Sequence, residues 1–137
     1  MVRFGNFEVE YNRNAPDKVS VRIETDDKGE VWLPKCDIAR AYGVFVQSVN
    51  AGLKSLAKTG DFDEYRDVRV EHFTYNGKYC SVDLYSLATI IALGFRMKGL
   101  KCEAFRKWAA RRLEESFEKK KNTVILCMSG EKRNSWN

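Results

Sequence analysis

Five residues of the segment 46–58 carry the kinds of side chain with which proteins read duplex DNA. Glutamine and asparagine can each bond the N6 and N7 atoms of adenine, and alanine can contact the methyl group of thymine. Lysine can reach phosphate or guanine, and serine can add a phosphate contact. These five residues are Gln47, Ser48, Asn50, Ala51 and Lys54. At helical spacing all but the serine lie on the face opposite Val49 and Leu53, which predicts a helix that reads bases.

The element that must position these side chains is the segment Pro34–Ala57, which the pattern predicts to be two short helices joined by a tight turn. Gly43 stands where a helix-turn-helix needs a residue that accepts positive φ. Ala39 is small enough for the second helix to cross the first, and Val49 plugs the corner from the other side. The alternative is an ordinary helical hairpin within a core. The remaining apolar faces at helical spacing are supplied by Ile38, Tyr42, Val44, Leu53 and Leu56.

A β-hairpin is predicted directly after this helix pair. The segments Val68–Thr74 and Lys78–Val82 flank an Asn-Gly pair, which is the strongest short signal for a hairpin turn. A hairpin in this position is called a wing, and wings commonly contact the phosphate backbone or the minor groove. Arg69, Asn76 and Lys78 could make such contacts. The alternative is a hairpin that only covers the core.

The residues that could support catalysis do not form a recognisable site. The chain has no Gly-rich phosphate loop and no GxSxG motif, and its one histidine, His72, lies on a predicted strand without a nominated partner. A cluster of carboxylates could hold Mg²⁺, but four acids in one loop are more typical of a solvated connection. These acids are Asp61, Asp63, Glu64 and Asp67. We therefore expect no enzyme, no cofactor and no small-molecule substrate.

The cysteines argue against a zinc site. The four are widely spread, and no two form a CxxC pair: Cys36, Cys80, Cys102 and Cys127. With a single histidine in the chain, the ligands of a zinc centre are lacking. We therefore expect no bound metal, and we interpret the thiols as reduced core residues of a cytoplasmic protein.

The N-terminal third predicts a small antiparallel meander that leads into the first helix. Phe7–Tyr11 and Val19–Glu24 alternate apolar and polar residues, as half-buried strands do. Turn residues occupy 12–17 between them, and a second turn at 26–29 leads to a short strand, Val31–Leu33.

Two more helices are predicted towards the C-terminus. Ser86 caps the apolar segment Leu87–Leu93, and a long helix follows at about Lys101–Lys119. Its apolar stripe comprises Cys102, Phe105, Ala109, Leu113 and Phe117. Thr123–Met128 could form a strand. The fold class is therefore α+β: a winged helix-turn-helix-like core with N-terminal antiparallel strands and a long C-terminal helix over residues 1–121, then a C-terminal strand or tail over 122–137.

Composition and charge limit the class of protein. The 137 residues are 44% hydrophobic and 31% charged, as in one globular domain. No apolar run approaches the roughly 20 residues that a bilayer needs, and the N-terminus does not resemble a signal peptide. The net charge of +5 is unevenly placed, because 95–121 holds ten lysines and arginines against four glutamates and 35–58 holds four against one aspartate. Such concentration is typical of nucleic-acid binding, although basic residues can also merely solvate a helix face.

Two blocks of residues resemble the RhuM-type proteins of bacterial pathogenicity islands, conjugative elements and prophages. The first block contains Trp32-Leu33, Ile38-Ala39, Tyr42-Gly43-Val44, Val49, Leu53-Lys54 and Gly60-Asp61. The second contains Leu87, Ile90-Ile91, Gly94-Phe95-Arg96, Phe105-Arg106 and Trp108-Ala109, and it is the more specific. The resemblance covers about Val31–Leu113. RhuM-type proteins are similar in habitat and presumed role to the KilA-N, Bro and antirepressor-type modules of phages. The resemblance implies a DNA-binding protein of a mobile element.

We therefore expect a transcriptional regulator or antirepressor-like factor that binds double-stranded DNA. One recognition helix covers only a few base pairs, so we expect a homodimer, with the apolar Thr123–Met128 as the shared surface. The alternative is a virulence-associated protein-interaction module that does not bind DNA. In that case Phe45 and Val46, which replace the usual Ser or Thr at the start of the second helix, would anchor a protein partner.

Overall fold

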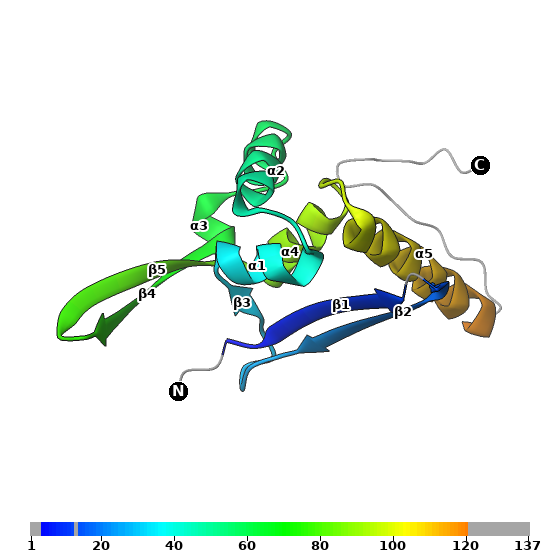
Figure 1. The fold of residues 1–137 in the computed structure, drawn as a ribbon, viewed down its shortest axis with the longest axis horizontal. Helices are drawn as coiled ribbons and strands as arrows, with labels where there is room; N and C mark the ends of the chain where they lie inside the picture. The colour runs from blue at the N-terminus through cyan, green and yellow to red at the C-terminus, as the bar shows by residue number, and fades with distance from the viewer. Residues whose placement is uncertain (1–3, 13, 121–137) are drawn as a thin grey trace.

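Alternating residues near the N-terminus form a two-stranded antiparallel sheet of β1 (Asn6–Asn12) and β2 (Ala15–Glu24). The computed structural model, which describes residues 4–12 and 14–120, places this sheet beside a second one (Figure 1). The second sheet consists of β3 (Trp32–Leu33), β4 (Val68–Tyr75) and β5 (Lys78–Ser86), in the order β3-β5-β4. The strands predicted before residue 121 are thus present, and the fold is mixed α+β.

Five helices complete the described part of the chain. They are α1 (Lys35–Tyr42), α2 (Val46–Lys58), α3 (Glu64–Asp67), α4 (Leu87–Gly94) and α5 (Leu100–Lys120). The first two follow β3, and α3 leads into the long β4–β5 hairpin (Figure 1). The C-terminal helix α5 packs against both β1 and β2 and also against α4. None of the helices in the described ranges is long and apolar enough to cross a membrane.

The predicted N-terminal meander is wrong in its third strand. β3 pairs with β5, with Trp32 opposite Ser86 and Leu33 opposite Tyr85, and not with β2. The turn at Asp26 redirects the chain, because the carboxylate of Asp26 accepts hydrogen bonds from the backbone N–H groups of Lys28 and Glu30. Pairing with β5 carries Leu33 into the core, where it is buried. β2 also begins earlier than predicted, within the segment that we had expected to be a turn.

Aromatic side chains from distant segments meet at the centre of the core. The rings of Phe7 on β1, Tyr42 on α1 and Phe105 on α5 lie 5.5–5.7 Å apart, and Trp108 stacks on Phe105. The buried hydroxyl of Tyr42 donates a hydrogen bond of 2.7 Å to the backbone oxygen of Ile90 on α4. Desolvation of this hydroxyl raises the pKa of Tyr42 far above its ordinary value. The cluster thus joins β1, α1, α4 and α5.

The apolar stripe predicted for α5 is buried over its first half only. Cys102 and Phe105 are buried, but Leu113 is 51% exposed. Periodicity identifies the apolar face of a helix but not how far the partner surface extends along it. The segment 122–137, with the predicted strand Thr123–Met128, lies outside the described residues.

Candidate nucleic-acid interface

The connection between α1 and α2 has the tight geometry that the sequence predicts. Gly43 ends α1 in the left-handed conformation, with φ 63° and ψ 37°. The N–H groups of Gly43 and Val44 donate to the carbonyl oxygens of Arg40 and Ala39, which closes the last turn of α1. The chain then extends through Phe45, and α2 begins at Val46 without a side-chain cap. Ala39 on α1 and Val49 on α2 are both buried, and the two helices pack against each other.

The buried face of α2 determines which of its side chains reach the surface. Val49, Gly52, Leu53 and Leu56 are buried, and Gly52 allows a close approach of α4, because an added Cβ would lie 2.7 Å from the Cδ2 atom of Leu93. At 100° per residue the opposite face is a stripe that is exposed along its whole length. This stripe, which we call the α2 stripe, consists of Gln47, Ala51, Lys54 and Lys58.

The other two predicted α2 residues lie on the flanks of the helix. Ser48 is half-buried on the flank that faces the α4–α5 loop. Asn50 is half-buried on the opposite flank, and its Oδ1 atom is buried without a hydrogen-bond partner among the described residues. The structure therefore brings Gln47, Ala51 and Lys54 together on one exposed surface.

The loop between α4 and α5 lies beside α2, which the sequence did not reveal. Arg96 donates to the hydroxyl oxygens of Ser55 and Thr59 at 2.9 and 3.2 Å, and its guanidinium also lies 3.4 Å from Asp61. Arg106 on α5 donates to the carbonyl oxygens of Gly94 and Met97, which fixes the loop from its other side. The loop is therefore anchored to the C-terminal half of α2.

This anchoring places further positive charge next to the α2 stripe. Lys98 lies on the fixed loop, on the rim of a shallow pocket of about 290 Å³ whose walls include Ser48 and Ala51. The side chain of Lys101 passes close to Gly43 at the turn. The sequence indicated this charge only through the excess of basic residues over 95–121. That excess does not show that the first residues of the segment lie beside α2. Some of these basic side chains contact other residues of the same chain. The guanidinium of Arg112 lies over the ring of Trp108 and 3.9 Å from Glu115.

The β4–β5 hairpin has the predicted turn at its tip but lies apart from α2. Asn76 and Gly77 both have positive φ, 52° and 77°, as a two-residue hairpin turn of this kind requires. The tip of the hairpin extends away from α2 (Figure 1). Asn76 and Lys78 belong to this tip, where Tyr75 pairs with Lys78. The alternative, a hairpin that only covers the core, does not describe this outer half, because residues 72–79 are exposed.

Arg69 at the base of the hairpin is held by contacts within the protein. Its guanidinium lies 4.9 Å from the centre of the Trp32 ring and 5.8 Å from that of Phe4. It also lies 3.8 Å from Glu30 and 3.4 Å from Glu71. These contacts leave the side chain one-third exposed and joined to the β3 segment.

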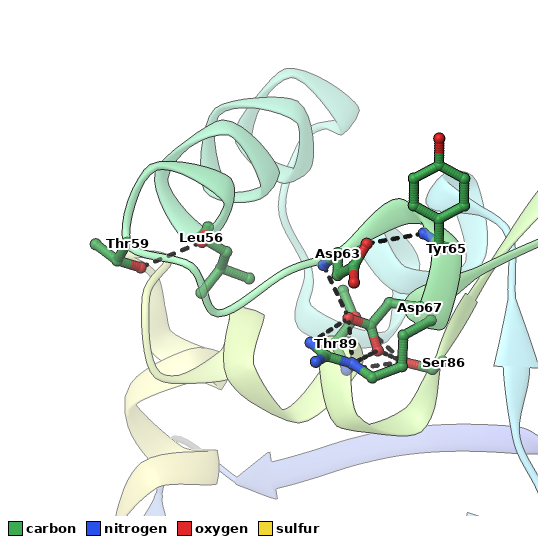
Figure 2. Close-up of polar contacts among 8 residues, drawn as sticks. Leu56, Thr59, Asp63, Tyr65, Asp67, Ser86 and Thr89 are labelled. Carbon is green, nitrogen blue, oxygen red and sulfur yellow. Dashed lines mark hydrogen bonds and ion pairs between the residues drawn. The ribbon is translucent and has the colours of Figure 1, made fainter. Parts of the chain in front are cut away.

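Asp67 was expected in a solvated loop, but it is 2% exposed. The carboxylate accepts hydrogen bonds from the guanidinium of Arg66 at 2.8 Å, the hydroxyl of Ser86 at 2.9 Å and the backbone N–H of Asp63 at 3.1 Å (Figure 2). Burial by itself raises the pKa of Asp67, but the hydrogen bonds from Arg66, Asp63 and Ser86 outweigh burial and hold the pKa below its ordinary value. The other three acids, Asp61, Asp63 and Glu64, are exposed as expected.

The Asp67 network fixes the base of the hairpin to the helices. Ser86 ends β5, and its Oγ atom also accepts the backbone N–H of Thr89, which caps α4 as predicted. Asp63 caps α3 by accepting the N–H of Tyr65 (Figure 2). One buried carboxylate therefore joins α3, the end of β5 and the start of α4.

Nothing in the described ranges assembles a metal centre, since no three His, Cys, Asp or Glu residues gather as ligands there. No protein-family model matches the chain, and no curated protein and no solved structure matches it either.

Proposed function

We propose that the protein binds duplex DNA through the α2 stripe, as a transcriptional regulator or antirepressor-like factor of a bacterial mobile element. In this proposal α1 and α2 are a helix-turn-helix and the β4–β5 hairpin is its wing. The observation that carries the proposal is the α2 stripe itself. It is an exposed row of Gln47, Ala51, Lys54 and Lys58 on a helix whose other face is buried and whose entry is set by Gly43.

The order of elements supports this reading. α1 and α2 are inserted between β3 and β4, and β3 pairs with the returning strand β5. A short strand, a helix pair and a hairpin that closes back on the strand are the arrangement of winged helices. The resemblance to RhuM-type proteins points to the same class of function, and it supplies the proposed link to mobile elements and a cytoplasmic location.

The charges around α2 support the same partner. Lys54 and Lys58 lie on the stripe, and Lys98 lies on the adjacent loop that Arg96 fixes in place. A phosphate backbone that follows the helix would meet cations on the stripe and on the flank that faces the α4–α5 loop. If about six phosphates are neutralised, the logarithm of the binding constant falls with a slope of about −5 against the logarithm of salt concentration.

The test is retardation of duplex DNA by the full chain, after selection of a preferred site from random oligonucleotides. Gln47→Ala should weaken binding to the selected site by about 1–3 kcal/mol and leave binding to scrambled DNA unchanged. Lys54→Ala should weaken both DNAs alike and reduce the salt slope by about one. Lys28→Ala, which removes an exposed charge in the turn after β2, is the matched control and should change neither.

Replacement of Asn50 can also change the stability of the fold, because its Oδ1 atom is buried. We still expect Asn50→Ala to relax specificity, but its stability must be measured beside its affinity. Lack of any retardation at low salt, or equal behaviour of Gln47→Ala and the parent on both DNAs, would remove α2 as the reader.

A protein-interaction function is the second candidate, and one observation favours it. Phe45 is 80% exposed and Val46 is 38% exposed at the start of α2. Exposed aromatic anchors are typical of protein interfaces. If this candidate holds, Phe45→Ser abolishes binding to a protein partner, and the chain retards no duplex at any salt concentration.

A further inference from the structure

The β4–β5 hairpin has an unusual surface, most of it in the outer half. It carries four of the eleven large apolar side chains that are exposed in the described ranges: Val70 (48%), Phe73 (45%), Tyr75 (65%) and Tyr79 (76%). This part of the hairpin projects from the rest of the molecule (Figure 1). Monomeric proteins rarely leave such a concentration of apolar surface in water, and a patch of this kind typically marks an interface.

The strand register sorts these residues onto two faces. Residues directly opposite in an antiparallel pair point to the same side of the sheet. One side, which we call the Phe73 face, consists of three rows: Glu71 opposite Val82, Phe73 opposite Cys80, and Tyr75 opposite Lys78. Its next row towards the base contains Leu84, which is buried. The apolar residues Val82, Phe73 and Tyr75 therefore continue outwards from a buried leucine, whereas the main core packs against the opposite face, where Val68 and Tyr85 lie.

On the opposite face, two rings contact each other. The ring of His72 stacks on that of Tyr79, with 5.4 Å between centroids and 8° between planes. Phe73 and Tyr75 take part in none of the ring contacts found among the described residues. The aromatic side chains of the Phe73 face thus make no ring contact within the described chain.

The charges on the Phe73 face are complementary to those of the same face on a second copy. The Glu71 row and the Lys78 row lie on either side of the Phe73 row, one row away from it in each direction. If two hairpins pack face to face and antiparallel about a two-fold axis, each Glu71 row meets the partner's Lys78 row. The two opposite-charge contacts are then related by symmetry, as in an isologous interface.

The hairpin charge argues against DNA as the occupant. From β4 to β5 the chain carries Arg69 and Lys78 against Glu71 and Asp83, so its formal net charge is zero. Glu71 on the face itself would repel phosphate, and Arg69 is held at the base by two glutamates. An apolar strip with one charge of each sign suits a protein surface better than a phosphate backbone.

We propose that the Phe73 face of the β4–β5 hairpin is a homodimer interface. Two copies of the chain pack their hairpins antiparallel, with Phe73 and Cys80 at the centre and Glu71 and Lys78 at the rim. This replaces Thr123–Met128 as the expected shared surface, and it assigns Lys78 to the partner subunit and not to DNA. The proposal does not depend on DNA binding, although a dimer would present two copies of α2.

The test is sedimentation equilibrium of the full chain, with a matched pair of variants on the two faces. Tyr75 and Tyr79 are both exposed tyrosines near the tip, but only Tyr75 lies on the Phe73 face. Tyr75→Asp should raise the dimer dissociation constant by at least about tenfold, as loss of an interface anchor does. Tyr79→Asp should leave it within about twofold, and circular dichroism and thermal unfolding must show both variants folded.

A charge exchange tests the antiparallel arrangement. Glu71→Lys and Lys78→Glu should each weaken the dimer, and the double variant should restore it to near the parent value. Rescue is informative because a variant that only damages the fold would not be repaired by the second change. In a chain with Cys36 and Cys127 replaced by serine, a short bismaleimide should also link the two copies through Cys80.

Four outcomes would overturn the proposal. One is a monomer at tens of micromolar, and another is equal weakening by Tyr75→Asp and Tyr79→Asp. A dimer that dissociates with Val124→Asp but not with Tyr75→Asp would place the interface in the C-terminal segment. Loss of DNA retardation in Lys78→Glu with an unchanged dimer would show the hairpin to be a DNA contact.

Discussion

Replacement of Asp67 by asparagine should destabilise the protein by about 2–3 kcal/mol at neutral pH. The carboxylate accepts hydrogen bonds from Arg66, Ser86 and Asp63, and it is 2% exposed. Asparagine has nearly the same shape, but only one of its two terminal atoms can accept a hydrogen bond. At least one donor therefore loses its partner, and the contact with Arg66 loses its charge.

The size of the effect follows from the exposure of each donor. A hydrogen bond to a charged group contributes about 1.5–3 kcal/mol where both partners are buried. The side chain of Arg66 is 62% exposed, so water screens that contact and its share is small. Most of the loss must come from the buried bonds to the Ser86 hydroxyl and the Asp63 N–H group.

The same carboxylate predicts how stability depends on pH. Burial raises the pKa of Asp67, but the hydrogen bonds from Arg66, Asp63 and Ser86 outweigh it and place the pKa below the ordinary value of 3.8. The folded state therefore releases this proton more readily than the unfolded state. The stabilisation is complete above the unfolded pKa and is lost as the pH falls through the lower, folded pKa. The difference between parent and Asp67→Asn should be constant from about pH 7 to 5 and should narrow below about pH 4.

Urea unfolding, followed by circular dichroism and tryptophan fluorescence at several pH values, measures this difference. Asp37→Asn is the matched control, because Asp37 also lies 2.7 Å from an arginine, Arg40, but on the surface of α1. Exposed pairs of this kind contribute less than about 1 kcal/mol. Equal losses in the two variants, or a difference for Asp67→Asn that does not narrow in acid, would refute the assignment of Asp67 as a buried, ionised anchor.

Three further changes test the α1–α2 corner and the core beneath it. Gly43→Val should lower the free energy of unfolding by more than about 2 kcal/mol. Gly43→Asn should lower it by less, because asparagine tolerates a φ near 63° better than valine does. Similar losses for the two variants in urea melts would contradict this explanation. Gly94→Ala should cost about 1–3 kcal/mol despite the better helix propensity of alanine, because its Cβ would lie 2.6 Å from the ring of Phe105 and the hydroxyl of Tyr42. Tyr42→Phe should lower the free energy of unfolding by about 1–2 kcal/mol, because the Ile90 carbonyl loses the hydroxyl donor of Tyr42. In the double variant with Gly94→Ala, the loss of stability should be smaller than the sum of the losses in the two single variants.

Features that depend on a few consecutive residues could be predicted from the sequence alone. Gly43 marks the corner of the helix pair, and Asn76-Gly77 marks the hairpin turn, because positive φ is sterically open to few residue types. Ser86 marks the start of α4, because its side chain caps a backbone N–H only three residues away. Helical spacing likewise separates the buried face of α2 from its exposed stripe.

The partners of these elements were decided only in the tertiary structure. β3 pairs with β5, which lies about fifty residues later in the chain, and local alternation contains no information about such a partner. Arg96 reaches Ser55 across 41 residues and so brings the loop with Lys98 to α2. Asp67 is buried where Ser86, 19 residues later at the end of β5, supplies a donor to its carboxylate, although its neighbours in sequence are typical of a solvated loop. Local sequence thus determines each element, whereas the surface that two elements share depends on which distant segments can satisfy its apolar and polar groups together.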